Sequence, residues 1–249
     1  MRLVLSLKRI QKNNSIKRNY YHFELWSGDQ ISVYSFSKGN LVLSDNTAKS
    51  DKLETLNEED ELRAQLYEFL ATLLRVEPTD AVVKKVAELT GDDTPIGKAS
   101  ATLAHLGRQM DGSAVRAEYV DLFIGVGRGE LLPYCSYYLT GFLNEKPLAN
   151  LRQDMAAIGI VRADGVKDPE DHIASLCDMM AGLIRGQFNR SFTLAEQASF
   201  FKKHLAPWAG LFFSDLESAK NAVFYSPVGS IGKAFMDIES KSFDMELSG

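Results

Sequence analysis

Hydrophobic residues recur at spacings of three and four from residue 57 to the C-terminal region, which is the period of an α-helix with one buried face. The clearest segment begins at Asn57, a favourable N-cap that four acidic residues follow, and its apolar stripe continues to Leu74. No alternating β-pattern occurs after residue 56, so the strands beneath a Rossmann or P-loop site are missing. The sequence therefore predicts an all-α fold with about nine helices.

Proline, glycine and capping residues mark the other predicted boundaries. Thr193 and Glu196 have the spacing of a capping box, and Asp168 followed by Pro169 combines an N-cap with proline at the first helical position. The stretch from Leu131 to Leu139 is expected to be a loop between helices. The remaining helices are predicted to start at Asp80, Thr94, Ser113, Pro147, Pro207 and Pro227.

The first 56 residues differ from the rest of the chain in charge and pattern. They carry 9 Lys+Arg and 5 Asp+Glu, a net charge of +4, whereas residues 57–249 carry 19 and 28, a net of −9. Only Tyr20 to Tyr34 alternates, as a strand or hairpin around Ser27-Gly28-Asp29 would, and Ser35 to Leu56 has the composition of a linker. We predict a flexible or weakly structured extension over 1–56 and one helical domain over 57–249.

Composition limits the classes of function. Mean hydropathy is −0.15, and no apolar run approaches the ~20 residues of a membrane-spanning helix. The two cysteines, Cys135 and Cys177, cannot form a disulfide framework, and the N-terminus lacks the features of a secretory signal. The basic charges of the extension neither cluster nor share a helical face, so nucleic-acid binding is not expected. These observations favour a protein of the cytoplasm without stable membrane insertion.

Two interruptions between the predicted helices carry candidate chemistry. Gly125 to Gly129 includes Arg128, but neither a dinucleotide fingerprint nor a P-loop is present, so a tight turn is the favoured interpretation. The next stretch contains Tyr134, Tyr137 and Tyr138, which suit either a recognition surface or an aromatic core cluster. The sequence leaves these two roles of the tyrosines open.

A third candidate is the run from Asp168 to His172, with three carboxylates and an imidazole. Such groups can act as general acid and base or form half of a metal site, but the other histidines are isolated and further ligands are lacking. Acidic residues at a helix start usually interact with the helix dipole. Ser136 lacks a nucleophile elbow, and neither cysteine has a local base. The residues therefore predict a binding module with no catalytic or metal-binding residues.

Three motifs follow one another along the chain: Glu118-Tyr119-x-x-Leu122-Phe123-x-Gly125, Leu132-Pro133-Tyr134-x-Ser136-x-Tyr138 and Pro169-x-Asp171-His172. In this order and spacing they resemble the TorD/DmsD/NarJ family of redox-enzyme maturation chaperones. The resemblance covers roughly residues 57–240 and excludes the N-terminal extension. It implies an all-helical chaperone that binds the twin-arginine signal peptide and the apo form of a molybdopterin enzyme, such as a DMSO-reductase-family oxidoreductase. Such a chaperone would assist cofactor insertion and delay export until maturation, without a cofactor of its own.

The resemblance also assigns candidate client-binding residues. Tyr134, Ser136 and Tyr138 match the aromatic motif, and Pro169, Asp171 and His172 match the motif linked to peptide binding. Their neighbours Tyr137 and Glu170 complete the expected site. A twin-arginine peptide presents two guanidinium groups beside an apolar run, so its receptor needs carboxylates next to an apolar groove. We expect Asp171 to be ionised and available to a client arginine, with His172 shaping the same edge.

Other functions remain as alternatives at this stage. A helical hydrolase or nucleotide-binding enzyme could use Asp171 and His172, and a helical interaction module could have another client. The sequence leaves open which molybdoenzyme is bound, whether guanine nucleotide binds and whether the chain is a monomer or a homodimer.

Overall fold

The computed structural model describes residues 20–27, 30–37, 56–161, 168–188 and 190–246. Two strands, β1 (Tyr20–Ser27) and β2 (Gln30–Ser37), pair antiparallel, with Tyr20 opposite Ser37 and Ser27 opposite Gln30. This is the hairpin that the alternation predicts. The predicted linker begins within β2, and its residues 38–55 lie outside the described residues. The chain separates into two units, the hairpin in one and the helices in the other.

The helical unit confirms the all-α prediction. No helix among the described residues is both long enough and apolar enough to cross a bilayer. The described residues form ten α-helices and one π-helical turn: α1 (Glu58–Arg75), α2 (Asp80–Ala87), α3 (Pro95–Gln109), α4 (Gly112–Tyr119), η1 (Val120–Ile124), α5 (Cys135–Thr140), α6 (Lys146–Ala157), α7 (Ile173–Arg185), α8 (Leu194–His204), α9 (Ala209–Ser218) and α10 (Tyr225–Glu246).

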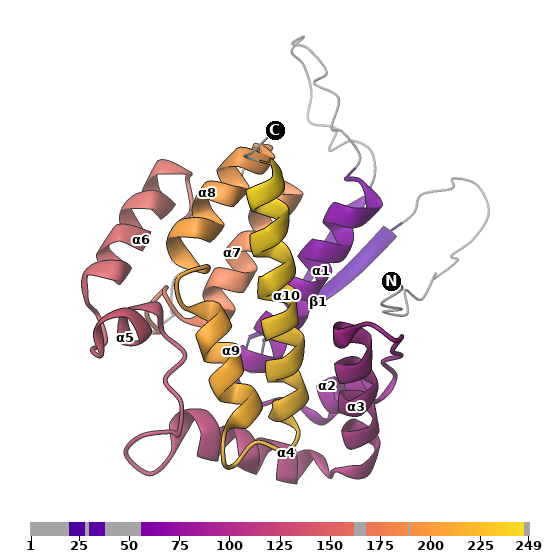
Figure 1. The fold of residues 1–249 in the computed structure, drawn as a ribbon. Helices are drawn as coiled ribbons and strands as arrows, with labels where there is room; N and C mark the ends of the chain where they lie inside the picture. Colours follow the sequence, from indigo (N-terminus) through magenta and orange to yellow (C-terminus); the bar gives the residue numbers. More distant parts are fainter. Residues whose placement is uncertain (1–19, 28–29, 38–55, 162–167, 189, 247–249) are drawn as a thin grey trace, which may run out of the picture. The chain divides into compact units, whose positions relative to one another are not determined.

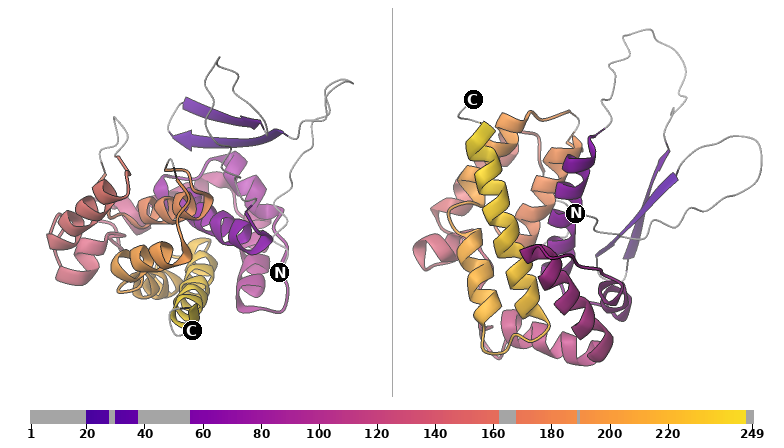
Figure 2. Two further views of the ribbon diagram at one scale, coloured as in Figure 1. Left: turned by 90° about the horizontal axis from the view of Figure 1, so that it is seen from above. Right: turned by 45° about the vertical axis from the view of Figure 1, so that its right-hand side comes forward.

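Helix α7 lies at the centre of this unit. Ten of its 13 residues are buried, and it packs against α1 and α8 (Figure 2). Helices α9 and α10 run side by side, and α10 also contacts α3 (Figure 1). Helix α6 lies beside α5 and α8 at the edge of the bundle. The largest fully buried side chains include Trp208, Phe201 and Phe212.

Local capping explains several helix starts. The Asn57 side chain accepts a hydrogen bond from Asp60 N at 2.7 Å, and Thr193 and Glu196 form the predicted capping box. Thr94 caps α3, with Pro95 at its first position, also as predicted. Thr79 rather than Asp80 caps α2. The remaining predicted starts are shifted by one or two residues, since the observed helices begin at Gly112, Lys146, Ala209 and Tyr225.

Two sequence predictions about helix positions are wrong. The helix predicted from Asp168 begins at Ile173, with His172 as its N-cap, because the residues just before it bond to another segment of the chain. The aromatic stretch predicted as a loop contains helix α5, which ends at Gly141 in a left-handed conformation with φ of 80°. Both corrections concern the segments that contain the candidate site.

A buried ion pair joins the two ends of the helical sequence. Arg63 on α1 donates to the two carboxylate oxygens of Glu239 on α10 at 2.7 and 2.9 Å, and the Tyr67 hydroxyl donates to the same carboxylate at 2.9 Å. The Glu239 side chain is 1% exposed. A charge so deeply buried depends on these partners.

We expect removal of residues 1–56 to leave the helical unit folded, because the helical core lies within the later residues. Thermal unfolding of a chain of residues 57–249 should match that of the full chain, and so should its affinity for a client peptide. A clear loss of either property would mean that the extension is part of the working domain.

Candidate functional site

The aromatic and acidic motifs meet in space, although 35 positions separate Ser136 from Asp171. Ile173 N donates to Pro133 O at 2.8 Å, and Cys135 N donates to Asp171 O at 3.0 Å. Tyr134 and His172 thereby form an antiparallel bridge between the two segments. The two motifs that the sequence shows separately are therefore one structural unit.

The carboxylate of Asp171 lies inside this unit. Its side chain is fully buried, and one carboxylate oxygen accepts a hydrogen bond from Ser136 N at 2.8 Å. Asp171 thus caps helix α5, whose own N-cap residue Tyr134 provides no side-chain bond. The expectation that this carboxylate is available to a client arginine is wrong, because it does not reach the surface.

His172 is also a positioning residue. Its Nδ1 accepts a hydrogen bond from Ala174 N at 3.1 Å, which caps α7. The rings of His172 and Tyr134 are in a T-shaped arrangement, with their centroids 5.0 Å apart. Burial, with a smaller contribution from the nearby charge of Arg75, lowers the pKa of His172 to about 3. The imidazole is therefore neutral at physiological pH.

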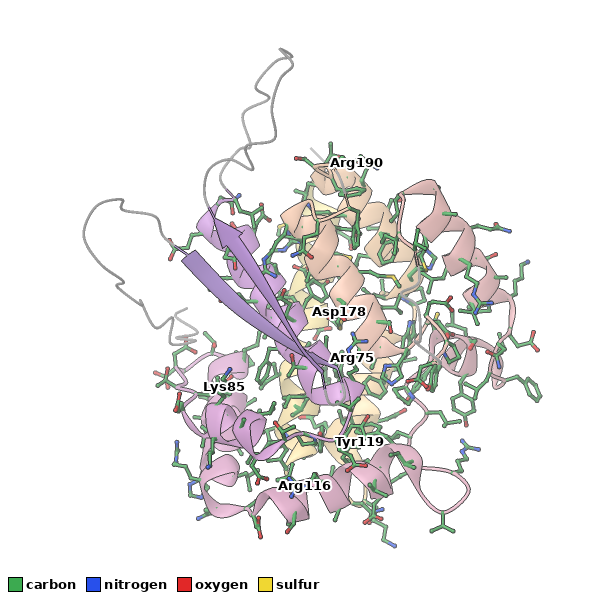
Figure 3. The ribbon with its side chains drawn as sticks, turned by 180° about the vertical axis from the view of Figure 1, so that it is seen from behind. Arg75, Lys85, Arg116, Tyr119, Asp178 and Arg190 are labelled. Atoms are coloured by element: carbon green, nitrogen blue, oxygen red, sulfur yellow. The ribbon has the colours of Figure 1, made fainter. Side chains whose placement is uncertain are left out.

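Arg75 joins the site to the first helix. Figure 3 shows Arg75 and Asp178 pointing toward one another, from α1 and α7 respectively. The guanidinium pairs with the Asp178 carboxylate and also donates to Ala174 O at 3.4 Å. Burial lowers the pKa of Arg75. This arginine fixes the start of α7 against α1, and no local sequence pattern indicated its role.

The tyrosines of α5 divide between the core edge and the surface. Tyr138 packs against Trp208 and Phe212, and its hydroxyl donates to Asp215 at 2.9 Å. Tyr137 instead contacts Arg128, whose guanidinium carbon lies 5.0 Å from the ring centroid. Tyr138 thus belongs to the edge of the aromatic core, whereas Tyr137 lies toward the surface.

Glu170 pairs with an arginine that is half exposed to solvent. Arg152 on α6 donates to it through Nε at 3.2 and 3.1 Å and through Nη2 at 2.8 Å. The Arg152 side chain is 51% exposed and that of Glu170 is 9% exposed, so the guanidinium lies on the solvent side of the carboxylate. Pro169, just before Glu170, is partly exposed. No local sequence pattern indicated Arg152, because its partner is 18 residues away.

A shallow groove of about 380 Å³ adjoins this ion pair. It is mainly apolar and lies between the C-terminal end of α6 and the segment that contains Glu170. Its lining consists of Arg152, Met155, Ala156, Gly159, Ile160, Val161 and Glu170. The groove thus places apolar side chains next to a carboxylate.

Glu118, the first residue of the first motif, stabilises the fold. Its buried carboxylate accepts hydrogen bonds from Val223 N at 2.8 Å, Phe224 N at 3.0 Å and Tyr225 N at 2.8 Å. It therefore caps α10 from α4. Tyr119, the next residue, donates to Leu74 O at 3.3 Å and so ties α4 to the end of α1.

The glycine run forms the tight turn that the sequence favours. Gly125 has φ of 60°, and a Cβ at this position would lie 2.1 Å from Arg128 O.

Burial raises the pKa of the Cys135 and Cys177 thiols to about 12, which suppresses the nucleophilic thiolate. Over the described residues, no group of three or more His, Cys, Asp or Glu side chains is arranged to hold a metal ion.

Comparisons with known proteins agree on one group of relatives. The family model for the nitrate reductase delta subunit matches residues 89–214. The TorD chaperone of Vibrio cholerae is 27% identical over 213 residues, which cover 78% of this chain and 96% of the relative. The TorD chaperone of Vibrio atlanticus is 30% identical over 135 residues, which cover 50% of this chain and 62% of the relative.

A solved structure has the same fold. The crystal structure of an Archaeoglobus fulgidus protein assigned to redox enzyme maturation matches with a TM-score of 0.50 and 18% identity. The match covers 76% of this chain and 99% of the other. At this identity the likeness concerns the fold alone.

Proposed function

This chain belongs to the nitrate reductase delta subunit family, the TorD/DmsD/NarJ group that its motifs resemble, and on that premise we propose that it is a maturation chaperone of a redox enzyme. Its client is the apo form of a molybdopterin oxidoreductase, recognised in the cytoplasm through a twin-arginine signal peptide. Binding holds back export until the cofactor is inserted. The chaperone itself carries out no catalytic step.

The main observation in support of this proposal is that the aromatic and acidic motifs lie side by side. The bridge between Tyr134 and His172 places the tyrosines of α5 beside the segment that contains Glu170. Tyr134, Tyr137 and Tyr138 are each partly exposed. Apolar and aromatic surface next to a carboxylate matches a peptide with arginines beside an apolar run.

The eight residues assigned from sequence divide into two roles in this proposal. Ser136, Asp171 and His172 position the surface, since their hydrogen bonds cap α5 and α7. The partly exposed tyrosines and Pro169 contact the peptide, and Glu170, at the solvent-facing Arg152, supplies the charge. Contact residues under this proposal are Tyr134, Tyr137, Tyr138, Pro169 and Glu170. The net charge of −9 over residues 57–249 attracts the basic peptide at long range.

Calorimetry with matched peptides tests the proposal. A peptide with Arg-Arg before an apolar run should bind more tightly than the same peptide with Gln-Gln. Tyr137→Ala should weaken binding by about 1 to 3 kcal/mol without lowering thermal stability, because this tyrosine lies on the surface. Tyr138→Ala is the comparison variant and should lower stability as well, because its ring packs on Trp208.

Equal binding of the two peptides would contradict signal-peptide recognition. Affinity purification from the native host, followed by mass spectrometry, should recover a molybdopterin oxidoreductase. Nucleotide-dependent or metal-dependent turnover that Asp171→Asn abolishes would instead establish an enzyme.

A further inference from the structure

Arg152 holds the Glu170 carboxylate as a peptide arginine would hold it. We propose that Arg152 occupies, in the free protein, the place that an arginine of the client peptide takes on binding. The peptide guanidinium replaces that of Arg152 at Glu170, and the apolar side chains beside it enter the adjoining groove. This inference rests on the proposed function and names the residue that selects for arginine.

The exposure of its partner identifies Glu170 as the selecting carboxylate. Asp171 is fully buried and caps α5, whereas Glu170, although only 8% exposed, pairs with a side chain that is itself 51% exposed. The long stem of Arg152 can move its guanidinium into water at little cost, because the group already lies at the surface. An exchange of partners then leaves Glu170 paired before and after binding, so no charge is buried alone.

The geometry of the pair favours arginine over lysine. Arg152 uses both Nε and Nη2 on the carboxylate, with donor–acceptor distances of 2.8 to 3.2 Å. A guanidinium can reproduce this two-point contact, but an ammonium group cannot. Selection by Glu170 should therefore distinguish Arg-Arg from Lys-Lys, which carry the same charge.

The rest of the groove complements such a peptide. Met155, Ile160 and Val161 provide apolar surface. The groove adjoins the C-terminal end of α6, where the helix dipole favours a cation, and among the described residues of α6 the last turn has no basic side chain. A peptide arginine would therefore meet both a carboxylate and the negative end of a helix, while the following apolar residues lie against the groove.

Calorimetry with three synthetic peptides tests this exchange. They differ only in carrying Arg-Arg, Lys-Lys or Gln-Gln before the same apolar run. The wild-type chain should prefer Arg-Arg over Gln-Gln by about 10- to 100-fold, and Glu170→Gln should remove most of that preference. Arg152→Gln should strengthen Arg-Arg binding about three- to fivefold and leave Gln-Gln binding unchanged, because it removes the competing guanidinium.

Glu145→Gln is the matched control, since it removes the same charge from the exposed N-cap at the other end of α6. It should retain the full preference for Arg-Arg. Thermal unfolding of each variant checks its fold, and the exposed Arg152 provides an independent test if Glu170→Gln is unstable. Retained Arg-Arg preference in Glu170→Gln, or weaker Arg-Arg binding in Arg152→Gln, would overturn the exchange while leaving signal-peptide binding intact. Failure of the wild-type chain to bind any of the peptides would overturn both proposals.

Discussion

Replacement of Glu239 by glutamine should lower the free energy of unfolding by about 3 kcal/mol, because it leaves the guanidinium of Arg63 buried without its main partner. The Arg63 side chain is 14% exposed and keeps only its contact with Asp60, at 2.7 Å, as an ion pair. The Tyr67 hydroxyl, which is fully buried, also loses a charged acceptor. Urea denaturation at neutral pH measures the change.

Asp237→Asn is the control for this prediction. Asp237 lies on the same helix, two positions before Glu239, and is exposed. Its replacement changes the net charge equally but should alter stability by less than about 0.5 kcal/mol. Similar stability losses in the two variants would show that the buried network is not the cause.

Acidification below about pH 6.5 should destabilise the chain through His172. The pKa of this histidine is lowered from 6.5 to about 3 in the folded protein, so the unfolded state binds a proton that the folded state does not. Stability is therefore retained above pH 6.5 and falls by about 1.4 kcal/mol per pH unit as the pH decreases toward the folded-state pKa. Denaturation measured at several pH values between about 7.5 and 5 shows this slope.

His172→Asn should flatten the profile. Asparagine does not titrate in this range and can still cap α7 by accepting from Ala174 N. Some slope should remain, because burial also lowers the pKa of His204 despite its contact with Asp154. Parallel profiles for the wild-type and variant chains would contradict a buried neutral imidazole at position 172.

Local sequence determined most of the helical architecture. Helix capping depends on atoms that lie within a few residues of one another, so the sequence alone reveals it. Examples are the cap at Asn57, the capping box of Thr193 and Glu196, and the start at Thr94-Pro95. The turn at Gly125 and the hairpin from Tyr20 follow from similarly short-range patterns. The sequence also contained both motifs of the candidate site.

Only the tertiary structure decided how those motifs are used. Asp168-Pro169 is a sound local start signal, but the hydrogen bonds from Cys135 N to Asp171 O and from Ile173 N to Pro133 O delay the helix until Ile173. The carboxylate of Asp171 caps a helix 35 positions earlier in the chain, and Arg152 reaches Glu170 across 18 positions. Such pairings depend on how the helices pack, which no spacing along the chain specifies, so the partners that packing supplies, rather than residue type, distinguish the capping carboxylate of Asp171 from the Glu170 carboxylate that pairs with a half-exposed arginine.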